Sequence, residues 1–190
     1  MVSIDVAKLD CTDCPAVSLL NVARIREVET MRLKALDELE VEPRLILLCE
    51  SPPISRFVYD PVSCYESSGL RANLREELVP GSDDKALFKF MNSRGIWVVD
   101  AALCPLHKLD KKSQRRDAAT KCLQRHTSLY LQDLSNVPLV AIFPTGCRIL
   151  KRQLPSIAAR IKARFDFSRL DGLRELVDQW ASSMQQETQL

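Results

Sequence analysis

The sequence lacks any apolar run near the roughly 20 residues that a membrane-spanning helix needs, which excludes a membrane partner. Residues 1–10 alternate charges with short apolar pieces and have no signal-peptide core, so we expect a cytoplasmic protein. Charges of neither sign dominate, because the chain has 27 Lys and Arg residues and 25 Asp and Glu residues, which gives a net charge of +2. Any contact with nucleic acid therefore needs a local basic patch.

Histidine is scarce, and three common catalytic motifs are missing. The sequence has no Ser–His–Asp arrangement, no Walker loop and no G-x-G-x-x-G. Of the two histidines, His107 closely follows Cys104 and is a candidate neighbour of a metal, whereas His126 is expected on a helix surface. There are no internal repeats or linkers, and 190 residues fit one domain spanning 1–190.

Seven cysteines are present, and a reducing compartment argues against structural disulfides. Cys11 and Cys14 form a C-x-x-C, Cys104 follows an expected strand, and Cys122 lies in the next helix. Such a pair can supply two ligands to one metal site, and two more thiolates would complete a four-sulfur site. The alternatives are a surface C-x-x-C with two core cysteines, or a redox pair, which is less favoured because no strand precedes it. The remaining cysteines are expected to be packing residues: Cys49, Cys64 and Cys147.

Three short apolar runs, at 44–49, 95–100 and 138–143, predict buried parallel strands. Helices are expected at 16–40, 70–78, 83–91, 117–134, 147–152, 156–163 and 170–183, with a basic loop at 108–116. Strands separated by helices predict an α/β fold, a three-layer sandwich with a short central parallel sheet. Ligands of such sheets bind outside the carboxyl ends of the strands.

Candidate site residues follow these strand ends. Glu50 comes directly after the first strand, where it can orient a water, or act as an ordinary loop acid or cap. Asp100 holds the matching position on the second strand, and is either a binding group or a turn former. Phe57 and Tyr59 offer rings that stack on a nucleobase or simply cover the sheet edge.

The best basic patch is Lys108, Lys111, Lys112, Arg115 and Arg116. It has the composition of a phosphate-backbone contact, and equally of a solvated helix start.

The order of these motifs resembles that of the iron–sulfur uracil-DNA glycosylases of family 4, over about residues 11 to 150. That family opens with a C-x-x-C, as here. Its Gly-Glu-Ala-Pro-Gly loop is matched by Cys49-Glu50-Ser51-Pro52-Pro53, and its Asn-Val-Val-Lys-Cys segment by Asp100-Ala101-Ala102-Leu103-Cys104. Its fourth cysteine is matched by Cys122, and its Val-Ile-Val-Ala-Leu-Gly strand by residues 140–146.

The resemblance implies a uracil-DNA glycosylase-like fold, a DNA or nucleobase-containing partner and a [4Fe–4S] cluster, with zinc as the alternative. It assigns the cluster to Cys11, Cys14, Cys104 and Cys122. It also implies that Glu50 places the water, that Phe57, with Tyr59 close by, stacks on the base, and that Asp100 reads the base edge.

Two departures from the family bear on function. Asp100 replaces an asparagine, and because a carboxylate only accepts hydrogen bonds, a base with an exocyclic amine suits it better than uracil. The family's His-Pro-Ser loop is missing, since the nearest segment, 165–169, has no histidine. We therefore expect a monomer that is a divergent DNA glycosylase acting on a damaged base other than uracil. The alternatives are a non-catalytic iron–sulfur relative that binds nucleic acid or a partner, and an unrelated α/β protein without cofactor.

Overall fold

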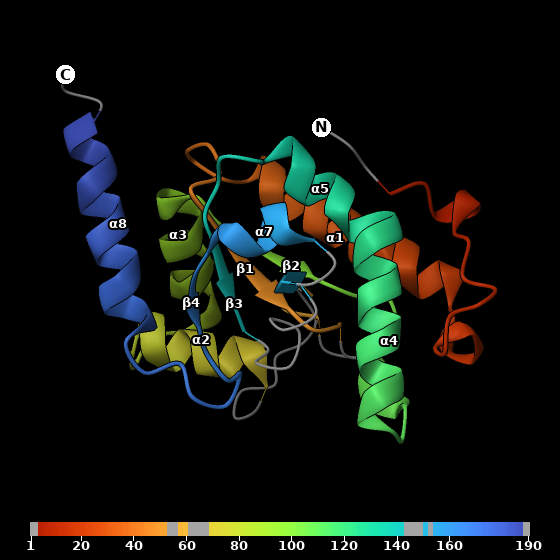
Figure 1. Cartoon of the computed structure of the whole chain (residues 1–190). Coiled ribbons are helices and arrows are strands. Elements are labelled where there is room, and N and C mark those ends of the chain that lie inside the picture. Colours follow the sequence, from red (N-terminus) through yellow and green to blue (C-terminus); the bar gives the residue numbers. More distant parts are fainter. Residues whose placement is uncertain (1–3, 53–56, 61–68, 143–149, 152–153, 188–190) are drawn as a thin grey trace.

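The computed structural model of the chain describes residues 4–52, 57–60, 69–142, 150–151 and 154–187 (Figure 1). Its centre is a four-stranded, all-parallel sheet in the order β2-β1-β3-β4. The strands are β1 (Leu45–Cys49), β2 (Ile96–Asp100), β3 (Leu139–Ala141) and β4 (Ile161–Arg164). The predicted α/β class with a short parallel sheet between two helical layers is confirmed.

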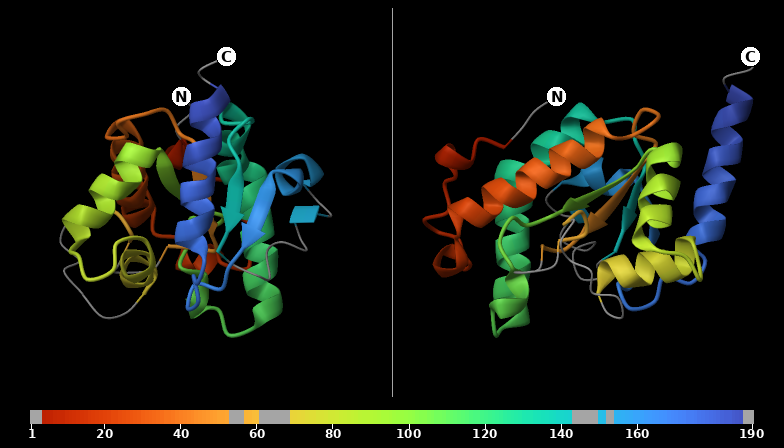
Figure 2. Two further views of the ribbon diagram at one scale, coloured as in Figure 1. Left: turned by 90° about the vertical axis from the view of Figure 1, so that its left-hand side faces the viewer. Right: turned by 180° about the vertical axis from the view of Figure 1, so that it is seen from behind.

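Helices cover both faces of the sheet. They are α1 (Val22–Asp37), α2 (Leu70–Leu78), α3 (Asp84–Arg94), α4 (Lys112–Cys122), α5 (Ser128–Asp133), α7 (Pro155–Ala159) and α8 (Leu173–Glu187). Helices α2, α3 and α8 share one apolar cluster with one face of the strands, and α4, α5 and α7 share a second cluster with the other face. The left view of Figure 2 looks onto the first of these layers. No helix in the described part of the chain is long and apolar enough to cross a membrane.

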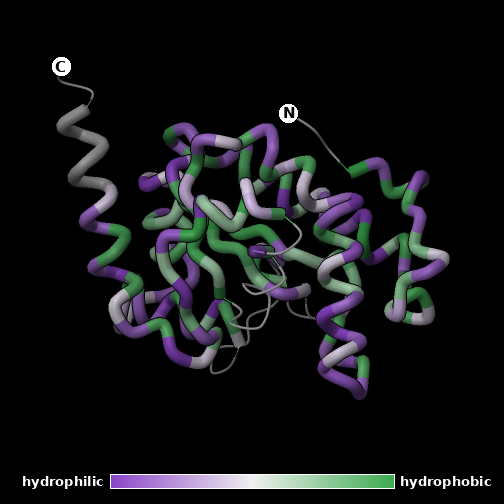
Figure 3. Tube along the Cα trace, in the orientation of Figure 1, coloured by the Kyte–Doolittle hydropathy of each residue, from purple (hydrophilic) through white to green (hydrophobic). Residues whose placement is uncertain are grey.

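Strands β1 and β3 are apolar along their whole length because both faces of the sheet are covered there. Every residue of β1 is buried: Ile46 and Leu48 pack toward α4 and α5, whereas Leu45, Leu47 and Cys49 pack toward α2 and α3. Figure 3 shows this hydrophobic centre surrounded by more polar helices.

The predicted strands are confirmed as β1, β2 and β3, although residue 143 lies outside the described residues. The predicted helix at 156–163 is wrong after α7, because Ile161–Arg164 form the edge strand β4. In β4, Ile161 and Ala163 are half-buried while Lys162 and Arg164 are exposed. This two-residue alternation is too short to be separated from a helical pattern by spacing alone.

The predicted basic loop at 108–116 is also wrong from Lys112 onward, because α4 begins there. Helix α4 continues without a break through a π-helical turn, η4 (Leu123–Thr127), into α5. Of the predicted helix at 147–152, residues 150–151 are helical and the rest lies outside the described residues.

Helix α1 begins later than predicted, at Val22 rather than near residue 16. The side chain of Asn21 accepts a hydrogen bond from the Arg24 backbone N at 3.0 Å and caps the helix there. Residues 4–20 therefore form a separate N-terminal arm with two short 3-10 turns, η1 (Val6–Lys8) and η2 (Val17–Leu19). The arm carries the C-x-x-C.

Candidate metal centre

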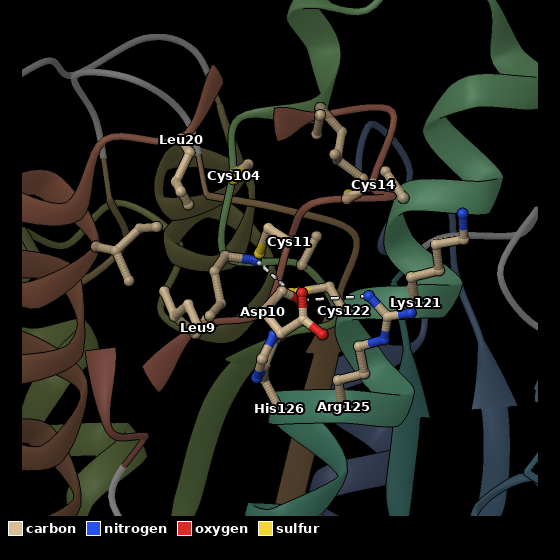
Figure 4. Close-up of a pocket in the computed structure, with 16 residues that line it drawn as sticks. Leu9, Asp10, Cys11, Cys14, Leu20, Cys104, Lys121, Cys122, Arg125 and His126 are labelled. Carbon is tan, nitrogen blue, oxygen red and sulfur yellow. Dashed lines mark hydrogen bonds between the residues drawn. The ribbon is translucent and has the colours of Figure 1, made fainter. Parts of the chain in front are cut away.

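One pocket is lined by Cys11, Cys14, Cys104 and Cys122 (Figure 4). Cys11 and Cys14 come from the N-terminal arm, Cys104 from the segment after β2, and Cys122 from the last residue of α4. The cavity inside this pocket is small, about 20 Å³. The structure thus brings together the four cysteines that the sequence singled out, and no others, among the cysteines it describes.

The C-x-x-C turn is clamped onto the helix that carries Cys122. Its backbone closes through the Cys14 N to Cys11 O hydrogen bond of 2.9 Å. Between the two cysteines, Asp13 accepts from both terminal nitrogens of Arg125, at 2.5 and 2.9 Å, and its carbonyl accepts from Lys121 Nζ at 2.7 Å. The hydrogen bond from Arg125 lowers the pKa of Asp13 to about 2.

The two inner thiols are buried. Burial raises the pKa of Cys104 and of Cys122 to about 12, and the neighbouring cysteines add to the effect. The Leu103 backbone N donates a hydrogen bond to Cys122 Sγ at 3.2 Å, and this bond lowers the pKa of Cys122 and so offsets part of the effect of burial. Both thiols are thus protonated at neutral pH until a metal displaces the protons.

The four thiols suit an iron–sulfur cluster or zinc by their chemistry. Within the described ranges, no group of three or more His, Cys, Asp or Glu side chains stands close enough together to hold one metal ion.

His126 also lines this pocket, and the expectation that it lies on a helix surface is wrong. The side chain is only 9% exposed, because η4 turns it inward next to Cys122. Burial lowers the pKa of His126, so the imidazole is neutral at pH 7. His107, the histidine predicted near the metal, is exposed and does not line the pocket.

The other predicted binding residues meet around a buried arginine. Arg32 of α1 is fully buried, and its Nη2 donates to Asp100 Oδ2 at 3.1 Å while its Nη1 donates to Glu29 Oε2 at 3.0 Å. The guanidinium carbon lies 5.5 Å from the centre of the Phe57 ring. Asp100 and Phe57 are 3% and 1% exposed. The guanidinium of Arg32 therefore lies between the Phe57 ring and the Asp100 carboxylate, where the resemblance would place a nucleobase.

Tyr59 has a structural partner as well. Its hydroxyl accepts from the Val98 backbone N at 2.8 Å and so caps the free edge of β2. Its ring meets that of Phe57 edge-on, with centroids 5.6 Å apart. Burial raises the pKa of Tyr59 well above its ordinary value.

The sequence pattern did not single out Arg32. A charged residue in an amphipathic helix is usually solvated. Arg32 is buried because α1 packs against β2, the edge strand of the sheet. In the right view of Figure 2, α1 runs along this side of the sheet.

Glu50 and Asp100 stand at neighbouring strand ends, where the Glu50 carbonyl accepts from the Ala102 backbone N at 3.0 Å. Their charged neighbours differ, because Arg115 of α4 acts on Glu50 and Arg32 of α1 on Asp100. Glu50 is half-buried, and burial raises its pKa.

Asp100 should make stability depend on pH. Burial raises its pKa from 3.8 to about 6 despite the attraction of Arg32. The folded chain thus holds this proton more tightly than the unfolded chain, and the contribution of Asp100 to stability falls as pH rises through this range. We expect the unfolding free energy of the wild type, relative to Asp100→Asn, to drop by about 2 kcal/mol from pH 4 to pH 7. Urea unfolding of both proteins at several pH values measures this, and a constant difference contradicts it.

A second cavity, of about 170 Å³, lies where the ligand crevice of a parallel sheet is expected. Pro52 after β1, Leu103 to Pro105 after β2, and Arg24 of α1 line it. The Nε and Nη2 atoms of Arg24 are buried there without a hydrogen bond.

Comparisons with protein-family models, with curated proteins and with solved structures give no match to this chain. The pocket with four thiols and the cluster around Arg32 are thus the features from which a function is inferred.

Proposed function

We propose that this chain is a [4Fe–4S] protein on a uracil-DNA glycosylase-like domain, and that it binds nucleic acid without cleaving it. Cys11, Cys14, Cys104 and Cys122 are the proposed ligands. The observation that supports this is their convergence from three separate segments on one pocket. A bound cluster supplies one-electron chemistry and ties the N-terminal arm to the domain.

A cluster and a single zinc ion require different distances between the four thiols. A single zinc ion draws four thiolates to about 3.8 Å from one another, because Zn–S bonds of about 2.3 Å point to the corners of a tetrahedron. A cubane of iron and sulfide keeps its ligands further apart. The four cysteines share one pocket, so iron with acid-labile sulfide or zinc in the anaerobically reconstituted protein decides between the two groups.

The cluster around Arg32 argues against base excision. Phe57 and Asp100 are the groups that the resemblance assigns to the base, and both are engaged by a guanidinium that is fully buried. Expelling Arg32 would leave Glu29 and Asp100 as buried unpaired charges, which costs several kcal/mol. A base therefore has no access to these groups while the fold is intact.

The start of α4 is the proposed nucleic-acid surface. It follows β2 through residues 101–111, so it lies at the end of the sheet where the strands terminate, and it extends beyond the sheet (Figure 1). Lys108, Lys111, Lys112 and Arg116 are exposed there. Arg115 instead holds the preceding loop, donating to the Leu109 carbonyl at 2.7 Å.

Reversing charge at this surface should weaken binding to single-stranded DNA. For Lys111→Glu with Lys112→Glu we expect affinity to fall at least tenfold, and the slope of log K against log salt to decrease by about 0.7 for each lost phosphate contact. Fluorescence anisotropy at several salt concentrations measures both. The matched control is Lys85→Glu with Lys89→Glu on the exposed side of α3, which should bind like the wild type. Equal losses in both variants contradict this surface.

A divergent DNA glycosylase acting on a damaged base other than uracil is the second candidate, and Glu50 favours it. A half-buried acid with a raised pKa, just past the end of β1, suits a residue that orients or deprotonates a water. The test is excision from single-stranded and duplex oligonucleotides carrying several damaged bases, with Glu50→Gln as control. Excision that Glu50→Gln abolishes would overturn the non-catalytic proposal, and no product with any base at high protein concentration would end the enzymatic one.

A further inference from the structure

His126 has a buried nitrogen without a partner in the cysteine pocket. Its side chain is 9% exposed, and its Nε2 makes no hydrogen bond with the described residues. Among the described residues, the other buried side-chain nitrogen or oxygen atoms that lack a hydrogen bond are all arginine nitrogens. Leaving a buried polar atom unpaired costs about 1–3 kcal/mol, so a native structure normally supplies a partner, from the chain or from a bound group.

The helix directs His126 toward the thiols. Cys122 and His126 are four residues apart on one continuous helical stretch, which places their side chains on the same side. His126 lies in the π-helical turn η4, and such turns occur frequently at functional sites. Figure 4 shows its ring beside Asp10, at the edge of the pocket that Cys11 and Cys122 line. The adjacent Arg125 lines the same pocket, and it donates to the Asp10 carbonyl at 3.2 Å and to the Asp13 carboxylate.

We propose that His126 Nε2–H donates a hydrogen bond to a sulfur of the [4Fe–4S] cluster and thereby raises its reduction potential. This inference rests on the proposed function. The sulfurs of a cluster are acceptors, and the reduced cluster carries one more negative charge than the oxidised one. A donor therefore stabilises the reduced form more, and hydrogen bonds to the sulfurs are one of the protein's means of setting the potential. The four thiols complete the ligand set, so His126 is a positioning residue and not a ligand.

Redox titration followed by electron paramagnetic resonance tests the direction of the effect, with dithionite as the one-electron donor. For His126→Leu we expect the reduced-to-oxidised ratio at the wild-type midpoint to fall about tenfold, which is 59 mV for one electron. His126→Gln keeps an N–H donor at a similar reach and should stay close to the wild type. His107→Leu, at the exposed histidine, is the matched control and should not shift. Equal midpoints in the wild type and in His126→Leu would overturn the proposal.

A second measurement does not depend on the variant keeping its cluster. Pulsed electron paramagnetic resonance of the reduced wild type, labelled with ¹⁵N-histidine, should show a weak nitrogen coupling that persists in His107→Leu. No coupling, or the strong coupling of a directly ligating nitrogen, overturns the hydrogen bond while leaving the cluster intact. Failure of anaerobically reconstituted wild type to hold iron and sulfide would instead overturn the proposed function, and this inference with it.

Discussion

Replacing Cys11 and Cys14 with alanine should abolish cluster binding. Both residues line the thiol pocket, and the remaining Cys104 and Cys122 supply only half of a four-sulfur set. We expect iron and acid-labile sulfide to fall below a tenth of the wild-type content, with loss of the broad visible absorption of the cluster. Because metal binding is coupled to folding, the N-terminal arm should also become sensitive to protease, as detected by limited proteolysis.

The control for this result is Cys49→Ala. Cys49 is buried in β1 and packs on the opposite face of the sheet, away from the pocket. Its loss removes a small apolar side chain and leaves all four proposed ligands in place, so iron content should stay at the wild-type level. Equal iron content in the double variant and in the wild type contradicts the ligand assignment.

Arg32→Met should be the most destabilising single substitution of those considered. It leaves Glu29 and Asp100 as buried carboxylates without their common partner, and breaking a buried ion pair in this way costs about 3–5 kcal/mol. The Glu29 side chain also accepts hydrogen bonds from the Tyr130 hydroxyl and from the Ile4 backbone N of the arm. Urea unfolding of the wild type and the variant measures the loss.

The rescue variant separates charge from packing. Adding Glu29→Gln and Asp100→Asn to Arg32→Met removes both orphaned charges while keeping the size of the side chains. We expect this triple variant to regain about 2 kcal/mol or more relative to Arg32→Met. A loss below about 1 kcal/mol in Arg32→Met, or no recovery in the triple variant, shows that the pairing with Arg32 does not stabilise the fold.

Much of this architecture was predictable from the sequence. Apart from Asp100 at the end of β2, the three buried strands are short continuous apolar runs, and they are bounded by proline, glycine or charged residues. Cys11 and Cys14 were predicted to act together from their C-x-x-C spacing, the resemblance added Cys104 and Cys122, and the structure places all four on one pocket.

The surroundings of these groups were not predictable. Arg32 and His126 lie in helices with many charges, where spacing alone does not separate a buried polar residue from a solvated one. Their burial depends on tertiary contacts: α1 against the edge of β2, and the arm against η4. Short edge strands such as β4 pose the same difficulty, because four residues carry too few repeats to fix a period.

The most direct test of the proposed cluster is X-ray absorption at the iron edge of the anaerobically purified wild-type protein. The proposal predicts scattering from sulfur neighbours together with a short iron–iron distance, and both should disappear in the Cys11 and Cys14 double variant. Zinc in place of iron, iron with nitrogen and oxygen neighbours alone, or a protein without metal after reconstitution would contradict it.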